Sequence, residues 1–375
     1  MSTSMIDSAV RRPRRPWRMA LPLAFVIVLA TGWSGFWYYA AGRADVELAA
    51  WRGRQAAAGR VFGCGTQSIA GFPFRIEFKC SEPALSLRSR GLALKANDLL
   101  AVVQIYQPSL LIGEFTGPLT VADEAGAPTA TIDWTSAQAS VRGLSATPER
   151  VSLVLEKPSL ARFANAAPQP FANAGHLELH ARQAPRLPQD PMVVDLALNL
   201  AKALFPGIAR VPDGPIDADV TGTLRGLQDF RPKPWQQLLR ELQAENGRLD
   251  ITHARIQQGE VIATGQGTLS LTARGTLDGQ IDLTVAGIEQ LVAELGLDKK
   301  VGQASQKALD RMAPGLNLDK LLGPRGNAAL AAAGVAMLGQ PAELEGRRAV
   351  TLPLRIADGA VFLGPLRAGE IPPLF

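Results

Sequence analysis

Cysteine and histidine are scarce in this sequence: its 375 residues include only 2 cysteines and 3 histidines. Neither cysteine has a histidine, an aspartate or the other cysteine at the short spacing of zinc ligands, which argues against a structural zinc. Signatures of a serine hydrolase (G-x-S-x-G), a phosphate-binding loop (G-x-x-x-x-G-K-[ST]) and a zinc protease (H-E-x-x-H) are missing as well. We therefore expect no cofactor, no metal and no catalytic residues. A hydrolase assembled from distant strands is the remaining enzymatic alternative.

Charged residues are also few, at 19% of the chain, whereas hydrophobic residues make up 47%. The formal net charge is +5, and most of it lies in the leader 1–18, where Asp7 opposes five basic residues: Arg11, Arg12, Arg14, Arg15 and Arg18. Five minus one leaves +4 in this basic leader and therefore +1 in the rest of the chain. Nucleic-acid binding needs clustered cations with stacking aromatic residues, which the rest of the chain lacks. Nucleic acid is not an expected partner.

An uncharged run, 19–42, follows the basic leader. It exceeds the roughly 20 residues that a helix needs to cross a bilayer, and aromatic residues lie near both of its ends. Because a positive leader stays in the cytoplasm, we expect a single-pass inner-membrane anchor with the bulk of the protein in the periplasm. A cleaved signal peptide is the alternative, although its only small-x-small site is Gly42-Arg43-Ala44. An alanine-rich, membrane-proximal helix over 43–62 should continue out of the membrane.

Both cysteines lie in one short stretch, GCGTQSIAGFPFRIEFKC, which runs from Gly63 to Cys80. In an exported protein the simplest interpretation is a disulfide between Cys64 and Cys80, and two unpaired thiols are the alternative. Within this loop, apolar residues recur at every second position: Phe72, Phe74, Ile76, Phe78 and Cys80. This period predicts a β-strand with one buried face.

The same loop contains the motif Gly71, Phe72, Pro73, Phe74 and Arg75. Gly71 lets the chain turn, and Pro73 cannot donate a hydrogen bond, so the motif should begin a strand or lie at a sheet edge. If the preceding helix leaves a membrane, Arg75 lies near lipid headgroups, where its guanidinium could bind a phosphate. The alternative is an ordinary ion pair with Glu77 or another neighbour.

Short alternating segments bounded by Gly, Pro, Asn and Asp fill most of the remaining chain and predict sequential antiparallel strands. A proline-rich stretch at 185–191 suggests a boundary between a first β lobe with the disulfide, 63–185, and a second β lobe with helices, 186–375. Helices are predicted over 234–247, 288–296, 299–315 and 327–341, and turns at Asp278-Gly279 and Asp358-Gly359. The expected fold is mainly β (α+β): an N-terminal transmembrane helix followed by a large curved antiparallel sheet with a few covering helices.

Two groups of polar residues could carry chemistry. His176, Glu178 and His180 share one face of a predicted strand, which is how a metal site can begin. A polar strand face explains them more simply, because a third, distant ligand would be needed. Asp217 and Asp219 also share a strand face, and carboxylate pairs of this kind occur by chance in any chain.

These motifs together resemble bacterial exported proteins grouped as domain of unknown function 2125, found mainly in alphaproteobacteria. The resemblance runs from about Arg43 to the end of the chain. The residues that carry it are Cys64, Gly71, Phe72, Pro73, Phe74, Arg75 and Cys80, with Asp358, Gly359, Gly364 and Pro365 near the end. The family has no assigned activity, so the resemblance implies no catalytic residues. The layout, an anchor helix followed by strand-rich sheet, is also similar to that of AsmA-like envelope proteins.

A long sheet with one apolar face must cover that face with its own helices or curl it into a groove. The predicted strands exceed the helices that are available to cover them. We therefore expect a non-catalytic protein that holds or transfers lipid or supports cell-envelope assembly, with the inner membrane, lipid and envelope proteins as partners. The alternative is a scaffold or protein-interaction module of the envelope with a closed core.

Overall fold

The computed structural model describes residues 17–143, 147–165, 167–185, 192–206, 208, 214–230, 233–287, 339–363 and 366–375. They form a mostly antiparallel β structure with an apolar helix at its N-terminal end, which confirms the predicted fold class. The helices predicted over 288–296 and 299–315 lie outside the described residues. So do most of the helix predicted over 327–341 and the motif residues Gly364 and Pro365.

Two α-helices occur in these ranges, α1 (Trp17–Ala57) and α2 (Trp235–Ala244), with a 3-10 turn, η1 (Arg88–Arg90). One sheet, called the short sheet, has seven strands in the order β1 (Arg60–Gly63), β4 (Ala84–Leu87), β5 (Leu92–Lys95), β8 (Leu119–Ala122), β9 (Pro128–Asp133), β12 (Ser159–Ala164) and β13 (Ala167–Asn173). The other, called the long sheet, has 16 strands. Its order is β2 (Thr66–Ala70), β3 (Arg75–Ser81), β6 (Asp98–Gln104), β7 (Gln107–Thr116), β10 (Ser136–Arg142), β11 (Arg150–Glu156), β14 (His176–Gln183), β15 (Met192–Ala203), β16 (Ile216–Leu227), β17 (Arg248–Gln258), β18 (Val261–Leu271), β19 (Leu277–Ala286), β21 (Arg347–Ala357), β22 (Ala360–Leu363) and β23 (Leu366–Glu370), with β20 (Gln340–Leu344) paired to β21.

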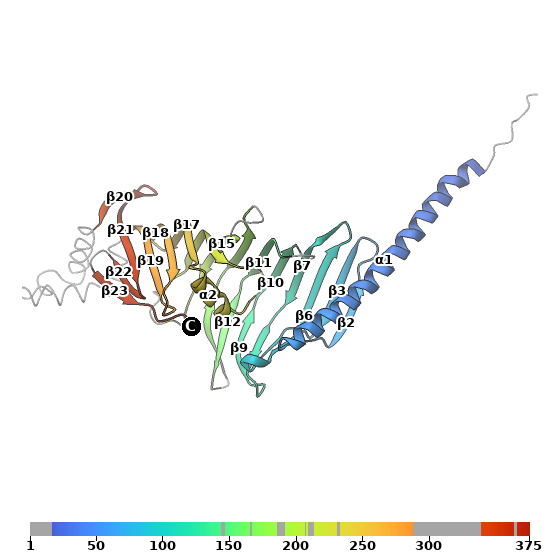
Figure 1. Cartoon of the computed structure of the whole chain (residues 1–375), viewed down its shortest axis with the longest axis horizontal. Coiled ribbons are helices and arrows are strands. Elements are labelled where there is room, and N and C mark those ends of the chain that lie inside the picture. The colour runs from blue at the N-terminus through green and yellow to red at the C-terminus, as the bar shows by residue number, and fades with distance from the viewer. Residues whose placement is uncertain are drawn as a thin grey trace, which may run out of the picture.

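α1 is one continuous helix that covers both the predicted span, 19–42, and most of the helix predicted to follow it. Its segment Ala20–Ala57 is long and apolar enough to cross a membrane, and only 6% of its most apolar window is buried inside the protein. It is therefore not the buried core helix of a soluble domain. Figure 1 shows α1 at one end of the sheets, projecting beyond them. The helix ends at Ala57, and Arg60–Gly63 already form β1.

The short and long sheets are two parts of one sheet bent along a line of corners. At each corner a strand of one sheet continues into a strand of the other, from β1 into β2 up to β13 into β14. Main-chain hydrogen bonds cross the corners: Glu82 N donates to Asn97 O at 2.7 Å, Asn97 N to Thr116 O at 3.2 Å, and Lys157 N to Gly175 O at 2.9 Å. The line of corners, called the fold line, is thus a hydrogen-bonded part of the sheet.

Proline lies at three of the seven corners of the fold line. Pro83, Pro118 and Pro158 each lie in the short connection between a long-sheet strand and a short-sheet strand. Proline cannot donate to a strand ladder, so it interrupts regular pairing at these points. The residues before two of these prolines, Glu82 and Lys157, have φ of 51° and 49°, which turns the chain out of the extended conformation.

Strand alternation gives the long sheet one apolar face, called the inner face, and one mostly polar face, called the outer face. Residues that pair directly across antiparallel strands share a face. One such row on the inner face consists of Cys80, Leu99, Phe115, Ala137, Leu155, Leu177 and Leu200. The neighbouring residues Glu178 and Asn199 pair in the same way on the outer face.

α1 lies against the apolar faces of both sheets. The ring of Trp51 packs on Phe62 of the short sheet, with the ring centroids 4.7 Å apart. The guanidinium of Arg52 lies 5.4 Å from the ring centroid of Phe78, which is on the inner face of the long sheet. Because one helix touches both apolar faces, they line the same side of the bend.

α2 covers the inner face further along the long sheet, as Figure 1 shows. Its residue Leu242 is buried with Met192, Val194 and Leu227 in one cluster, and this helix matches the one predicted over 234–247. Beyond it the buried positions continue toward β21 and include Leu352. The compact core of the described residues therefore lies in the second half of the long sheet.

The predicted turn at Asp278-Gly279 is wrong, whereas Asp358-Gly359 does connect β21 to β22. Asp278 and Gly279 lie within β19, where an added Cβ at Gly279 would be 2.1 Å from Thr268 O. The glycine is needed there because a neighbouring strand approaches closely. The boundary proposed at 185–186 falls between β14 and β15, which are paired strands of one sheet.

Candidate functional site

The first hairpin of the long sheet is tied to α1 by two indole hydrogen bonds. Trp33 Nε1 donates to Pro73 O at 2.8 Å, and Trp37 Nε1 donates to Arg75 O at 2.9 Å. These two tryptophans are one helical turn apart and therefore lie on the same side of α1. The sequence predicted aromatic residues near the end of the span and the motif 71–75 at the start of a strand. No local pattern indicated that the aromatic residues of the helix contact this motif.

Gly71 sets the shape of the turn that docks on the helix. Its φ is 103°, and an added Cβ would lie 2.6 Å from Arg75 O, so a side chain does not fit. Arg75 N donates to Gly71 O at 3.1 Å and closes the turn. The motif 71–75 thus serves to present three consecutive residues, Phe72, Pro73 and Phe74, to α1.

Aromatic rings fill this joint. Phe72 contacts Trp37 edge-on, with ring centroids 5.6 Å apart, and Phe74 contacts Trp33 with centroids 6.2 Å apart. Trp37 is buried, whereas both phenylalanine side chains remain largely exposed. The joint therefore leaves apolar rings facing outward beside the apolar helix.

Arg75 makes the ion pair that the sequence offered as its simpler role. Arg75 Nε lies 2.5 Å from Glu77 Oε1, and Lys79 Nζ lies 3.3 Å from Glu77 Oε2. Glu77 is buried, so its carboxylate is held by two cations whose own side chains are exposed. A phosphate-binding role for Arg75 stays a prediction.

The disulfide predicted between Cys64 and Cys80 is present, with a Cα–Cα distance of 5.7 Å. Cys64 lies in the corner between β1 and β2, and Cys80 lies on β3. Both β1 and β2 are edge strands, one of the short sheet and one of the long sheet. The cross-link therefore holds the N-terminal edges of both sheets at the fold line, directly beside the joint with α1.

The inner face between the two helices has no closed core. Within the described part of 60–185, the only buried residues are Glu77, Cys80, Gly113, Ala137 and Gly143. Large apolar side chains there are half-buried or exposed, and Leu179 on the inner face is 41% exposed. A sandwich of two packed sheets would bury such residues. This part of the bent sheet, from β6 to β14 and with its short-sheet partners, is therefore an open apolar trough, called the trough below.

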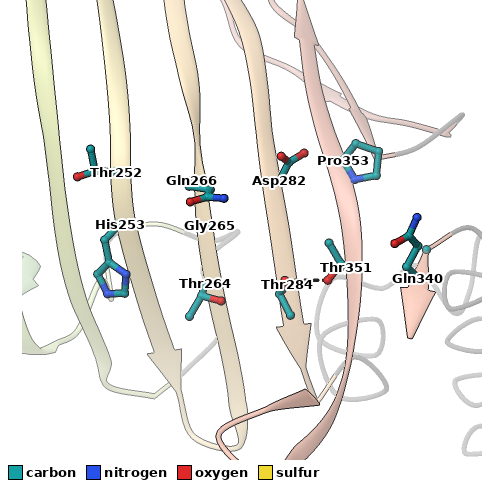
Figure 2. Close-up of a pocket in the computed structure, with 11 residues that line it drawn as sticks. Thr252, His253, Thr264, Gly265, Gln266, Asp282, Thr284, Gln340, Thr351 and Pro353 are labelled. Carbon is teal, nitrogen blue, oxygen red and sulfur yellow. Dashed lines mark hydrogen bonds between the residues drawn. The ribbon is translucent and has the colours of Figure 1, made fainter. Parts of the chain in front are cut away.

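The outer face is polar and carries shallow depressions. One of these has a volume of about 780 Å³ and crosses β17, β18, β19 and β21. Figure 2 shows Thr264, Thr284 and Thr351 in a row across three of these strands, with the hydroxyls of Thr284 and Thr351 2.9 Å apart. Gln266 and Asp282 lie in the neighbouring row. Hydroxyl and amide groups of this kind can bind polar molecules, but they do not define a reaction.

A chain of ion pairs on the outer face contains the two histidines that the sequence singled out. His176 Nδ1 lies 2.8 Å from Glu156 Oε1, His176 Nε2 lies 2.9 Å from Glu178 Oε1, and His180 Nε2 lies 3.1 Å from Glu178 Oε2. The hydrogen bond from Glu178 is the largest cause that raises the pKa of His176, and the hydrogen bonds from His180 and His176 lower the pKa of Glu178. Within the described ranges, no group of three or more His, Cys, Asp or Glu side chains is arranged so that it could hold a metal ion. The polar-strand interpretation fits this arrangement.

Asp217 and Asp219 make separate structural contacts. Asp217 Oδ1 accepts a hydrogen bond from Lys202 N at 2.8 Å, and Asp219 Oδ2 accepts one from Asn199 Nδ2 at 3.2 Å. Lys202 has φ of 53°, which interrupts the regular strand conformation near the end of β15. The Asp217 carboxylate therefore stabilises this irregular part of the strand.

The turn between β21 and β22 carries a polar cluster that the sequence did not predict. Asp358 Oδ1 accepts a hydrogen bond from the buried Thr276 hydroxyl at 2.5 Å, and Asp358 N donates to Asp278 Oδ2 at 3.2 Å. Arg274 pairs with the same carboxylate. The Asp-Gly turn signal indicated the turn but not this cluster, because its partners are about 80 residues away in sequence.

Comparison with known proteins identifies a family. A family model described as an uncharacterized protein conserved in bacteria, domain of unknown function 2125, matches residues 37–372. No curated protein and no solved structure gives a significant match. The matched range begins at Trp37, within α1, and includes the motif 71–75, the disulfide, both sheets and the Asp358-Gly359 turn, whereas Trp33 of the aromatic joint lies before it. The chain belongs to the bacterial family of domain of unknown function 2125.

Proposed function

We propose that this protein is anchored in the inner membrane by α1, with its sheets in the periplasm, and that the trough holds the acyl chains of a lipid. The open apolar inner face between α1 and α2 is the observation that carries the proposal. Apolar surface that stays exposed on this scale marks a binding surface or an aggregation hazard. A lipid is the occupant that we favour because the trough begins at a helix that is apolar enough to be surrounded by lipid.

The dimensions of the trough support an acyl occupant. Adjacent strands lie about 4.8 Å apart, so the stretch from β6 through β7, β10 and β11 to β14 is about 19 Å long. One leaflet of a bilayer contributes about half of a 30 Å hydrocarbon core, or roughly 15 Å. Each methylene that leaves water for this surface contributes up to about 0.8 kcal/mol. A chain of ordinary length could thus lie along the trough with most of its methylenes in contact.

Site-specific photo-crosslinking in intact membranes tests the proposal. Leu153 and Ser152 are adjacent on β11, yet Leu153 pairs with Leu179 on the inner face and Ser152 pairs with His180 on the outer face. A photoreactive phenylalanine analogue is placed at one position or the other in cells labelled with radioactive phosphate. We expect a labelled phospholipid adduct from position 153 and none from position 152.

Three results would contradict lipid binding in the trough. Adducts of equal yield from both positions would mean that lipid contact is unspecific. An unlabelled protein adduct from position 153 would instead favour a scaffold that binds an envelope protein on this face. Absence of any adduct from position 153 would also refute the proposal, provided that the same analogue at Val28 in α1 gives a lipid adduct.

A further inference from the structure

Exposed aromatic side chains gather at the rim of the long sheet beside α1. Phe72 and Phe74, in the turn between β2 and β3, are 51% and 60% exposed, and Tyr106, in the turn between β6 and β7, is 73% exposed. Ile105 N donates to Phe74 O at 3.0 Å, so the two turns lie side by side. We call these two turns, 71–74 and 105–106, the aromatic rim. Large rings exposed together on adjacent turns need an apolar or interfacial partner.

The depth of the aromatic rim follows from its hydrogen bonds to α1. Trp37 follows Trp17 by 20 residues (37 − 17) in one helix. At about 1.5 Å per residue this distance is about 30 Å, the thickness of a bilayer's hydrocarbon core. If position 17 lies at one boundary of that core, Trp37 lies at the other, and Trp33 lies about 6 Å inside it. With that placement, the bonds from these indoles hold Arg75 at the boundary and Pro73 within the acyl region.

Three consecutive backbone carbonyls in and next to the rim have hydrogen-bond partners. The carbonyls of three consecutive residues accept hydrogen bonds: Pro73 from Trp33, Phe74 from Ile105, and Arg75 from Trp37. Proline at position 73 has no N–H that would need a partner. Unpaired backbone groups are costly in hydrocarbon, and residues 73–75 leave no carbonyl unpaired.

We propose that the aromatic rim inserts into the periplasmic leaflet of the membrane that α1 crosses. The inference rests on the anchoring stated under the proposed function, but not on lipid binding in the trough. Insertion to about 6 Å is within the 5–10 Å that interfacial apolar segments reach. The row Ile76, Val103 and Leu111 on the inner face begins next to the rim, so the trough meets the leaflet at this end.

Fluorescence quenching by spin-labelled lipids tests the insertion with the full chain in nanodiscs. A bimane label is attached to a single added cysteine, with the Cys64–Cys80 disulfide intact, in three variants: Tyr106→Cys on the rim, Val28→Cys in the span and Ala125→Cys. Ala125 is an exposed residue in the turn between β8 and β9, at the opposite edge of the bent sheet. The nitroxide is carried either near the headgroup or deep in the acyl chain.

We expect the label at 28 to be quenched by the deep nitroxide, the label at 106 by the shallow one, and the label at 125 by neither. Quenching at 28 but none at 106 would overturn the insertion while leaving the anchor in place. No quenching at 28 would overturn the anchoring itself, and the inference with it. Equal quenching at 106 and 125 would also overturn it, because the rim would then have no special contact with the bilayer.

Discussion

Removal of the disulfide should loosen the first hairpin and leave the rest of the sheet intact. The change is the double substitution Cys64→Ser with Cys80→Ser. β2 is an edge strand whose only neighbour in the sheet is β3, and the cross-link joins the corner before β2 to the end of β3. In an elongated sheet each strand contacts only its neighbours, so loss of a local restraint acts locally.

The size of the effect follows from the length of the closed loop. The two cysteines are 16 positions apart, and a loop of this size corresponds to about 3 kcal/mol in the chain-entropy description. Since every 1.4 kcal/mol is a factor of ten, the open form of the hairpin should become about 150-fold more populated. The two indole hydrogen bonds to α1 remain in the variant, so the hairpin should open transiently and not detach permanently.

Hydrogen–deuterium exchange with mass spectrometry on the full chain in nanodiscs measures this opening. Amides of β2, and those amides of β3 that bond to β2, should exchange about 150-fold faster in the variant, and amides of β17 to β19 should serve as the unchanged control. Cys80 is buried, so a second variant with alanine at both positions separates loss of the cross-link from burial of a serine hydroxyl. Unchanged protection of β2 and β3 in both variants would refute the reasoning.

Two other predictions concern polar clusters. The ion pairs of His176 and Glu178 should stabilise the fold fully between pH 4.5 and 6.5. Because the pKa of His176 is raised, the stabilisation from His176 is complete below pH 6.5 and is lost at higher pH. Because the pKa of Glu178 is lowered, the stabilisation from Glu178 is complete above pH 4.5 and is lost at lower pH. Urea unfolding inside and outside this window checks it. His176→Gln should remove the loss on the alkaline side and reduce the loss on the acid side without removing it, because His180 still bonds Glu178. Asp358→Ala should lower the free energy of unfolding by about 2 kcal/mol, because the buried Thr276 hydroxyl loses an acceptor and alanine is strained at φ 51°. Asp358→Asn should lower the free energy of unfolding much less. Equal losses for these two substitutions in urea titrations would contradict that explanation.

Much of the local structure was readable from residue patterns. Alternation over Phe72, Phe74, Ile76, Phe78 and Cys80 predicted β3 and its apolar face, since the two-residue period is a property of the strand itself. The prediction is confirmed for the last three residues and wrong for Phe72 and Phe74, which lie in the exposed turn before the strand. The apolar run after the basic leader predicted α1, and its implication of an oxidising compartment made the Cys64–Cys80 disulfide the simplest pairing. In each case the residue pattern and the structural element that it predicts lie close together in the sequence.

The turn at Asp278-Gly279 shows where such reading fails. An Asp-Gly pair between alternating segments is a hairpin signal, but here the turn forms at Thr272–Gly275. Gly279 is required because Thr268 O on the neighbouring strand approaches too closely for a side chain. Glycine serves both needs, and only the pairing of β18 with β19 decides between them.

By itself, the sequence determined an apolar N-terminal helix, a succession of antiparallel strands with one apolar face, and a single cross-link beside the helix. Only the tertiary structure decided that the strands bend along one fold line and that the inner face stays open between α1 and α2. It also decided that the indoles of Trp33 and Trp37 hydrogen-bond to the carbonyls of Pro73 and Arg75. The physical reason is the distance along the chain over which each interaction acts. Alternation and hydropathy act between neighbours in the chain, whereas a groove exists only when many strands have paired and the covering helices have taken their places.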